Sequence, residues 1–116
     1  MNADRAKRII VEECLEQGGF AFSIRENRVD EEGFSRLLEA VREISRTVAA
    51  KDLIDRLVAA CLFELPWEIE NTVEHYSKQS PELGLTVSRM ADRLRAAIHE
   101  MLWGGLESHY MSPPKG

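Results

Sequence analysis

Apolar residues recur at three- and four-residue intervals through most of the chain, which is the spacing of one face of an α-helix. Segments with this spacing cover residues 3–17, 30–46, 52–65, 67–77 and 80–103. Such amphipathic segments bury their apolar stripes against one another. The pattern therefore predicts an all-α protein, a bundle of four to five helices.

Helix start and stop signals support these segments. Asn2, Asp30 and Ser80 are residues that favour the N-cap position, and Pro81 suits the first helical turn. Paired glycines after the first and last segments, Gly18-Gly19 and Gly104-Gly105, are typical of helix ends.

Residues 20–25 break the helical rhythm. Phe20, Phe22 and Ile24 alternate with smaller or polar residues, as in a β-strand. A single strand leaves its backbone groups unpaired, so a strand here needs a partner, either residues 106–111 or the same segment of a second subunit. Otherwise residues 20–25 form an extended packing loop.

The segment 52–65 is apolar around most of its circumference, which is typical of a helix at the centre of a bundle or in an interface. Pro66 follows it directly. Because proline lacks a backbone N–H, Pro66 either kinks this helix or begins the next one, expected over residues 67–77.

The length and composition indicate one globular domain. Of 116 residues, 44% are hydrophobic and 30% are charged, as in ordinary folded domains. We expect one helical domain over residues 1–112 and a flexible C-terminal tail over residues 113–116, where Pro113-Pro114 stand.

The charge balance narrows the classes of partner. The net charge is −5 and the isoelectric point about 5.2, which argues against nucleic acid and anionic membranes and favours a basic protein partner. The chain has no apolar run long enough for a membrane span or a signal peptide. We therefore expect a cytoplasmic protein, whose two cysteines, Cys14 and Cys61, are buried as free thiols.

No motif in the sequence indicates catalysis or a cofactor. The Glu-x-x-His element of di-iron bundles is missing before all three histidines, and no serine or cysteine stands in a nucleophile motif. The sequence thus predicts no catalytic, metal or cofactor site. An alternative is a helical bundle that binds a metal or a small ligand through His75, His99 and nearby carboxylates, with enzymatic activity.

The two tryptophans are the most informative residues for function. At about 100° per residue, Trp67 lies opposite the apolar stripe of its helix, and Trp103 lies opposite that of the last helix. Aromatic anchors within a polar rim are typical of interfaces. We therefore predict a non-enzymatic interaction module, a homodimer or a receptor for a basic protein, whose partner-binding face contains Trp67, Glu70, Asn71, Glu74, Leu85 and Trp103. The alternative is that both rings pack inside their own chain.

Overall fold

A computed structural model describes residues 1–110, and the expectation of a flexible tail falls outside this range. The described part of the chain contains helices and no strand, which confirms the all-α bundle. The helices are α1 (Ala3–Leu15), α2 (Phe20–Arg25), α3 (Glu31–Lys51), α4 (Arg56–Glu70), α5 (Val73–Gln79), α6 (Pro81–Trp103) and α7 (Glu107–Tyr110).

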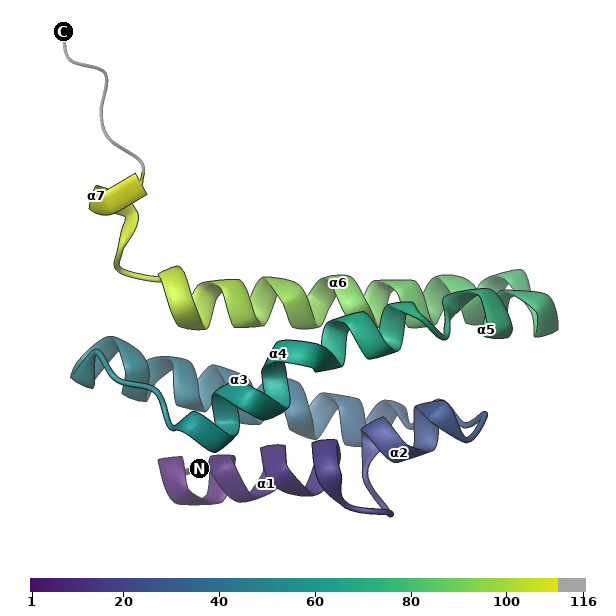
Figure 1. The fold of residues 1–116 in the computed structure, drawn as a ribbon, viewed down its shortest axis with the longest axis horizontal. Coiled ribbons are helices and arrows are strands. Elements are labelled where there is room, and N and C mark those ends of the chain that lie inside the picture. Colours follow the sequence, from purple (N-terminus) through teal and green to yellow (C-terminus); the bar gives the residue numbers. More distant parts are fainter. Residues whose placement is uncertain (111–116) are drawn as a thin grey trace, which may run out of the picture.

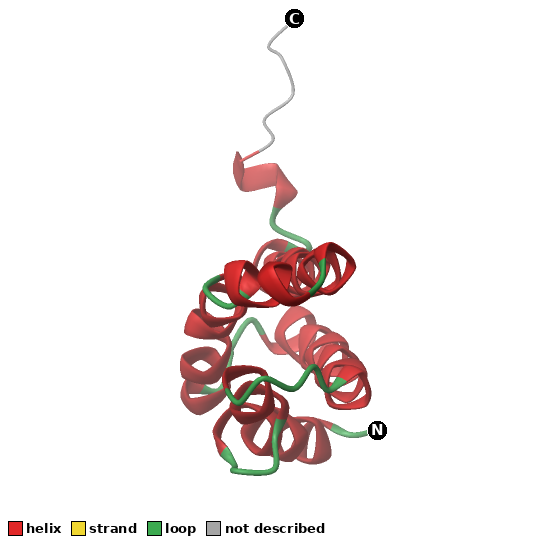
Figure 2. Ribbon diagram, turned by 90° about the vertical axis from the view of Figure 1, so that its right-hand side faces the viewer, coloured by secondary structure: helices red, strands yellow, loops and turns green. Residues whose placement is uncertain are grey.

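The helices stack in layers (Figure 1). α3 lies in the middle and contacts α1 on one side and α6 on the other. α4 contacts α1, α2 and α6, so it closes one side of the stack, as the end view in Figure 2 shows. α5 pairs with the beginning of α6, and the short α7 stands beyond the far end of α6.

The core forms where the apolar stripes of these helices meet. Phe20 of α2 and Phe34 of α3 are enclosed and their ring centroids lie 5.3 Å apart. Tyr76 of α5 is also enclosed, and its hydroxyl donates to the Ile24 carbonyl at 2.6 Å. This hydrogen bond satisfies a buried polar group and fastens α5 to the end of α2.

The predicted caps are present. The Asn2 side chain accepts the Arg5 N–H at 2.8 Å, and the Asp30 carboxylate accepts the Gly33 N–H at 3.0 Å. The Ser80 hydroxyl accepts the Leu83 N–H at 3.3 Å. Each cap satisfies one of the backbone donors that the first helical turn leaves without a partner.

The prediction of a strand or an extended loop at residues 20–25 was wrong, because this segment is the helix α2. Its buried residues include Phe20, Ala21 and Ile24, which is helical spacing, whereas Phe22 is only half-buried. Six residues are too few to separate the two periods. The proposed strand partner is also helical over residues 107–110.

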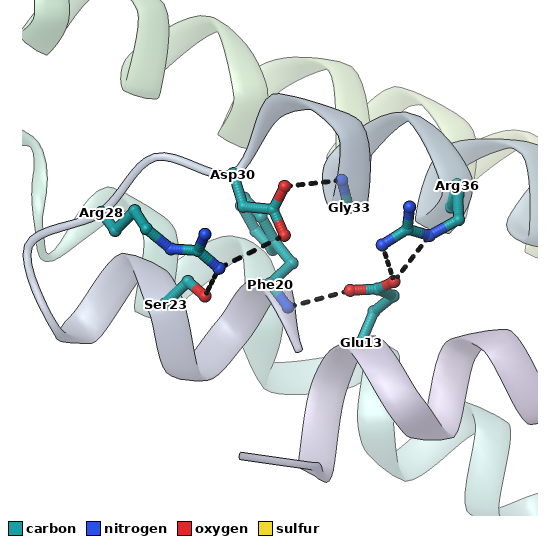
Figure 3. Close-up of polar contacts among 7 residues, drawn as sticks. All are labelled: Glu13, Phe20, Ser23, Arg28, Asp30, Gly33 and Arg36. Atoms are coloured by element: carbon teal, nitrogen blue, oxygen red, sulfur yellow. Dashed lines mark hydrogen bonds and ion pairs between the residues drawn. The ribbon is translucent and has the colours of Figure 1, made fainter. Parts of the chain in front are cut away.

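Contacts from distant helices hold α2 in place (Figure 3). Glu13 of α1 is 4% exposed, and its carboxylate accepts the Phe20 N–H at 3.0 Å at the start of α2. The same carboxylate accepts from Arg36 of α3 at 3.0 Å. One buried carboxylate therefore joins α1, α2 and α3, and its charge is balanced by a guanidinium group.

Two predicted boundaries around α4 were wrong. α3 runs to Lys51 and ends at Asp52, whose φ of 58° is left-handed, and α4 begins only after Asp55. At the other end, α4 continues through Pro66 to Glu70, so Trp67 belongs to α4 and α5 begins at Val73. Packing on both sides of α4 outweighs the one helical hydrogen bond that a proline removes.

Asp55 caps α4 and gives a test of the fold by pH. Its carboxylate accepts from the Lys7 ammonium at 2.7 Å and from the Leu57 and Val58 N–H groups. The hydrogen bond from Lys7 is the largest cause of a lowered Asp55 pKa, with the Val58 N–H second. A lowered folded pKa stabilises the fold above the unfolded value of about 3.9, and this stabilisation is lost as the pH falls through the folded value.

We therefore expect Asp55→Ala to lower the free energy of unfolding by about 1 kcal/mol at neutral pH. The difference from the wild type should shrink as the solution is acidified, as measured by urea unfolding at a series of pH values. Lys7→Met keeps the cap and removes the ion pair, so it should have a smaller effect in the same direction. A difference that stays constant down to strongly acidic pH would contradict this role.

α5 and α6 approach each other closely at Gly84. This glycine is buried, and a Cβ atom placed on it would lie 2.8 Å from the Cα of Ser77 in α5 and would also overlap the Ser77 hydroxyl. Since backbone atoms cannot move aside as a side-chain end can, the α5–α6 contact requires glycine at this position.

Candidate interaction groove

An apolar groove with a volume of about 480 Å³ lies between α4 and α6. Its walls are mainly apolar side chains of the two helices. We call it the α4–α6 groove and define it by Phe63, Pro66 and Trp67 of α4 and Ile98, Leu102 and Trp103 of α6.

The helical repeat of α4 explains why apolar residues remain on the outside. Val58, Leu62, Leu65 and Ile69 face the core and are buried. Phe63 and Trp67 are four residues apart and lie together on another side of the helix, where they are 84% and 64% exposed. α4 therefore carries more apolar surface than its own domain encloses.

α6 supplies the other wall in the same way. Its buried residues include Met90, Leu94 and Met101, and after them Leu102 and Trp103 turn outward and are 45% and 43% exposed. The His99 imidazole is stacked on the Trp103 indole with centroids 6.5 Å apart. This stacking holds the Trp103 ring at the edge of the groove.

The charges at one end of the groove are balanced within the chain. Arg95 lines the groove and forms ion pairs with Glu70 of α4 and, at 3.6 Å, with Asp92 of its own helix. Further along, Glu74 lies 3.5 Å from Lys78. Such exposed pairs contribute little to stability, but they reduce the negative field of this face.

The structure brings together part of the predicted partner-binding face. Trp67 and Trp103 line the same groove, and Glu70 forms an ion pair with Arg95, which also lines it. Asn71 and Glu74 are exposed but do not line it. Leu85 is 50% exposed, but it stands 18 residues before Trp103, roughly 27 Å along the axis of α6.

Sequence reasoning missed several residues of this site, among them Phe63, Leu102 and Arg95. Phe63 is the most exposed of the large apolar side chains described. It could have been found from Trp67, because residues four apart lie on the same side of a helix. Leu102 could have been found next to Trp103. Arg95 carries no sequence signal, because its partner Glu70 lies 25 residues away.

The histidines proposed for a metal site do not meet in the structure. His75 of α5 is exposed and its Nε2 lies 2.9 Å from Oδ1 of Asn27, whereas His99 of α6 lies against Trp103. Within residues 1–110, no group of three or more His, Cys, Asp or Glu side chains is placed to hold a metal ion.

None of the helices of the described range combines the length and the apolar composition of a membrane span. Comparison with known proteins adds no relative: no protein family, curated protein or solved structure matches this chain.

Proposed function

We propose that the chain is a non-enzymatic interaction module that forms a symmetric homodimer through the α4–α6 groove. The observation that carries the proposal is the exposure of three aromatic rings, those of Phe63, Trp67 and Trp103, along one groove. Isolated apolar side chains are common on protein surfaces, but a contiguous aromatic patch is typical of an interface.

The area of the patch suits a dimer. With about 150–250 Å² for a whole aromatic side chain, the three rings together leave on the order of 400 Å² in water. This is about half of the ~800 Å² that each partner buries in a standard interface. The other apolar walls, which include Leu102 and Pro66, add to it.

The shape of this surface favours a second copy as the occupant. The groove is a hollow, and Phe63 at its edge is a strongly exposed side chain. A two-fold axis places the same patch on both subunits, so the Phe63 side chain of each copy can enter the groove of the other. The same surface then provides both the projecting Phe63 side chain and the groove that receives it.

The charges also favour a second copy over a basic protein. Arg95 is paired with Glu70 and Asp92, and Glu74 is paired with Lys78. A basic partner would have to compete with these cations for the same carboxylates. In a homodimer, the ion pairs of one copy face the ion pairs of the other. Because the charges within each pair already balance, electrostatic repulsion between the two copies is small.

Sedimentation velocity from low to high micromolar concentration tests the proposal on the unmodified chain. We expect the mass of a dimer at the upper end, with tryptophan emission shifted to the blue as Trp67 and Trp103 leave water. A monomer at every concentration would contradict the homodimer. Native mass spectrometry of the same sample should show no bound apolar compound or metal; a stoichiometric one would favour the ligand-binding alternative instead.

A further inference from the structure

Two cysteine side chains meet between α1 and α4, on a different side of α4 from the aromatic groove. Cys14 lies in the last turn of α1 and Cys61 in α4, 8% and 9% exposed, and both are free thiols. The helices α1 and α4 that carry them are in contact. Both line a narrow cleft of about 160 Å³ that also borders on Arg25, Glu64 and Glu68.

We propose that Cys14 and Cys61 form a site of reversible oxidation, in which a small disulfide oxidant converts them into an internal disulfide that fastens α1 to α4. The site lies apart from the α4–α6 groove, so this inference does not depend on the proposed homodimer.

The positions of the two cysteines allow the bond. A disulfide requires the two sulfur atoms to approach to about 2.05 Å, and both side chains line the same narrow cleft. Cys14 stands near the end of α1, where the following residues 16–19 are not helical. A small shift of this last turn can bring the sulfur atoms together without moving the rest of α1.

The surroundings of the thiols keep them reduced at rest. Burial is the largest cause of a raised pKa for Cys14, with further contributions from Cys61, Glu68 and Glu13. Burial raises the pKa of Cys61 too. Because the thiolate is the reacting form, attack on an oxidant is slow at neutral pH and faster in alkaline solution. The nearby carboxylates also repel anionic oxidants, so an uncharged disulfide is the better co-reactant.

The chemistry balances in two exchanges. The thiolate of one cysteine attacks one sulfur of the oxidant, forms a mixed disulfide and releases the first thiol. The other cysteine then loses its proton to solvent and attacks the sulfur of the first cysteine, which releases the second thiol. The protein loses two electrons and two protons, and the oxidant disulfide gains them as two thiols.

Exposure of the folded protein to bis(2-hydroxyethyl) disulfide tests the proposal. We expect the wild type to lose both thiols together and to become lighter by two hydrogen atoms. Peptide mapping should then identify a Cys14–Cys61 bond, and a non-reducing gel should show a single chain. The rate should rise with pH. The chain unfolded in guanidine serves as the control for reactivity of the thiols. The proposal would be overturned if the folded protein kept both thiols over the time in which the unfolded chain reacts fully. It would also be overturned by stable adducts on both cysteines or by a disulfide bond between chains.

Two single variants test the need for both thiols. Cys14→Ala and Cys61→Ala should each stop at a mixed disulfide on the remaining cysteine, because the thiol that completes the bond is missing. A mixed disulfide that persists on the wild type as it does on the variants would overturn the internal bond. Circular dichroism establishes that both variants are folded, and the wild-type peptide map tests the bond without any variant.

Discussion

Replacing Glu13 by alanine is expected to lower the free energy of unfolding by about 1–3 kcal/mol, because it leaves the buried Phe20 N–H without its acceptor. The Phe20 N–H loses its acceptor, and the Arg36 guanidinium loses the carboxylate that it donates to. A domain of this size is stable by only about 5–15 kcal/mol, so the loss is a large part of the total. Urea unfolding followed by circular dichroism measures it.

Two variants control this experiment. Glu13→Gln keeps an oxygen for the Phe20 N–H and loses the charge, so its effect should lie between the wild type and Glu13→Ala. Glu12→Ala changes the neighbouring residue, whose carboxylate forms no hydrogen bond or ion pair within the described range, and should stay within about 0.5 kcal/mol. A Glu13→Ala protein as stable as the Glu12→Ala protein would contradict the role given to this carboxylate.

The double substitution Phe63→Ser, Trp67→Ser is expected to weaken the proposed homodimer by at least about 100-fold in dissociation constant. Aromatic residues at the centre of an interface each contribute about 2 kcal/mol or more, and 1.4 kcal/mol corresponds to a factor of ten. Since both side chains are largely exposed in the single chain, the variant should still fold. Sedimentation at several concentrations gives the constant for both proteins.

Leu85→Ser is the matched control, since Leu85 is half exposed on α6 but lies far from the groove. It should dimerise as the wild type does. If it dissociated while the double variant remained a dimer, the contact would involve the other end of α6 and the groove would not be the interface.

The parts of the fold that were predicted correctly depend on residues close together in the sequence. Asn2, Asp30 and Ser80 each accept from a backbone group three residues later, so their signals lie within one helical turn. The long apolar stripe that ends at Met101 gave α6 its full length for the same reason.

The errors occur where distant contacts decide the conformation. α2 begins at an N–H bound by Glu13 and is fastened at its end by Tyr76, 52 residues after Ile24. α4 continues through Pro66 because neighbouring helices pack on it. Neither effect has a local sequence signal, so the spacing of apolar residues assigned residues 20–25 to a strand or loop and ended the helix before Pro66, both incorrectly.

The candidate site was likewise predicted correctly where the signal is local in the sequence, and incorrectly where it depends on distant contacts. Helical arithmetic placed Trp67 on the outside of its helix, and the structure has it there. The same arithmetic placed Leu85 and Trp103 on the same side of the last helix, but it did not take into account the distance between them along the helix axis. The balance of Glu70 by Arg95 depends on the packing of α4 against α6, which the sequence does not specify.

The close approach at Gly84 also limits which sequences can adopt this fold. An alanine there would collide with the backbone of Ser77, so a chain with any larger residue must place its fifth helix elsewhere. Gly19 is under a similar restriction, because a Cβ on it would lie 2.8 Å from the Glu13 carbonyl oxygen. Two glycines, 65 positions apart, thus provide a marker for recognising distant homologues whose remaining residues have diverged.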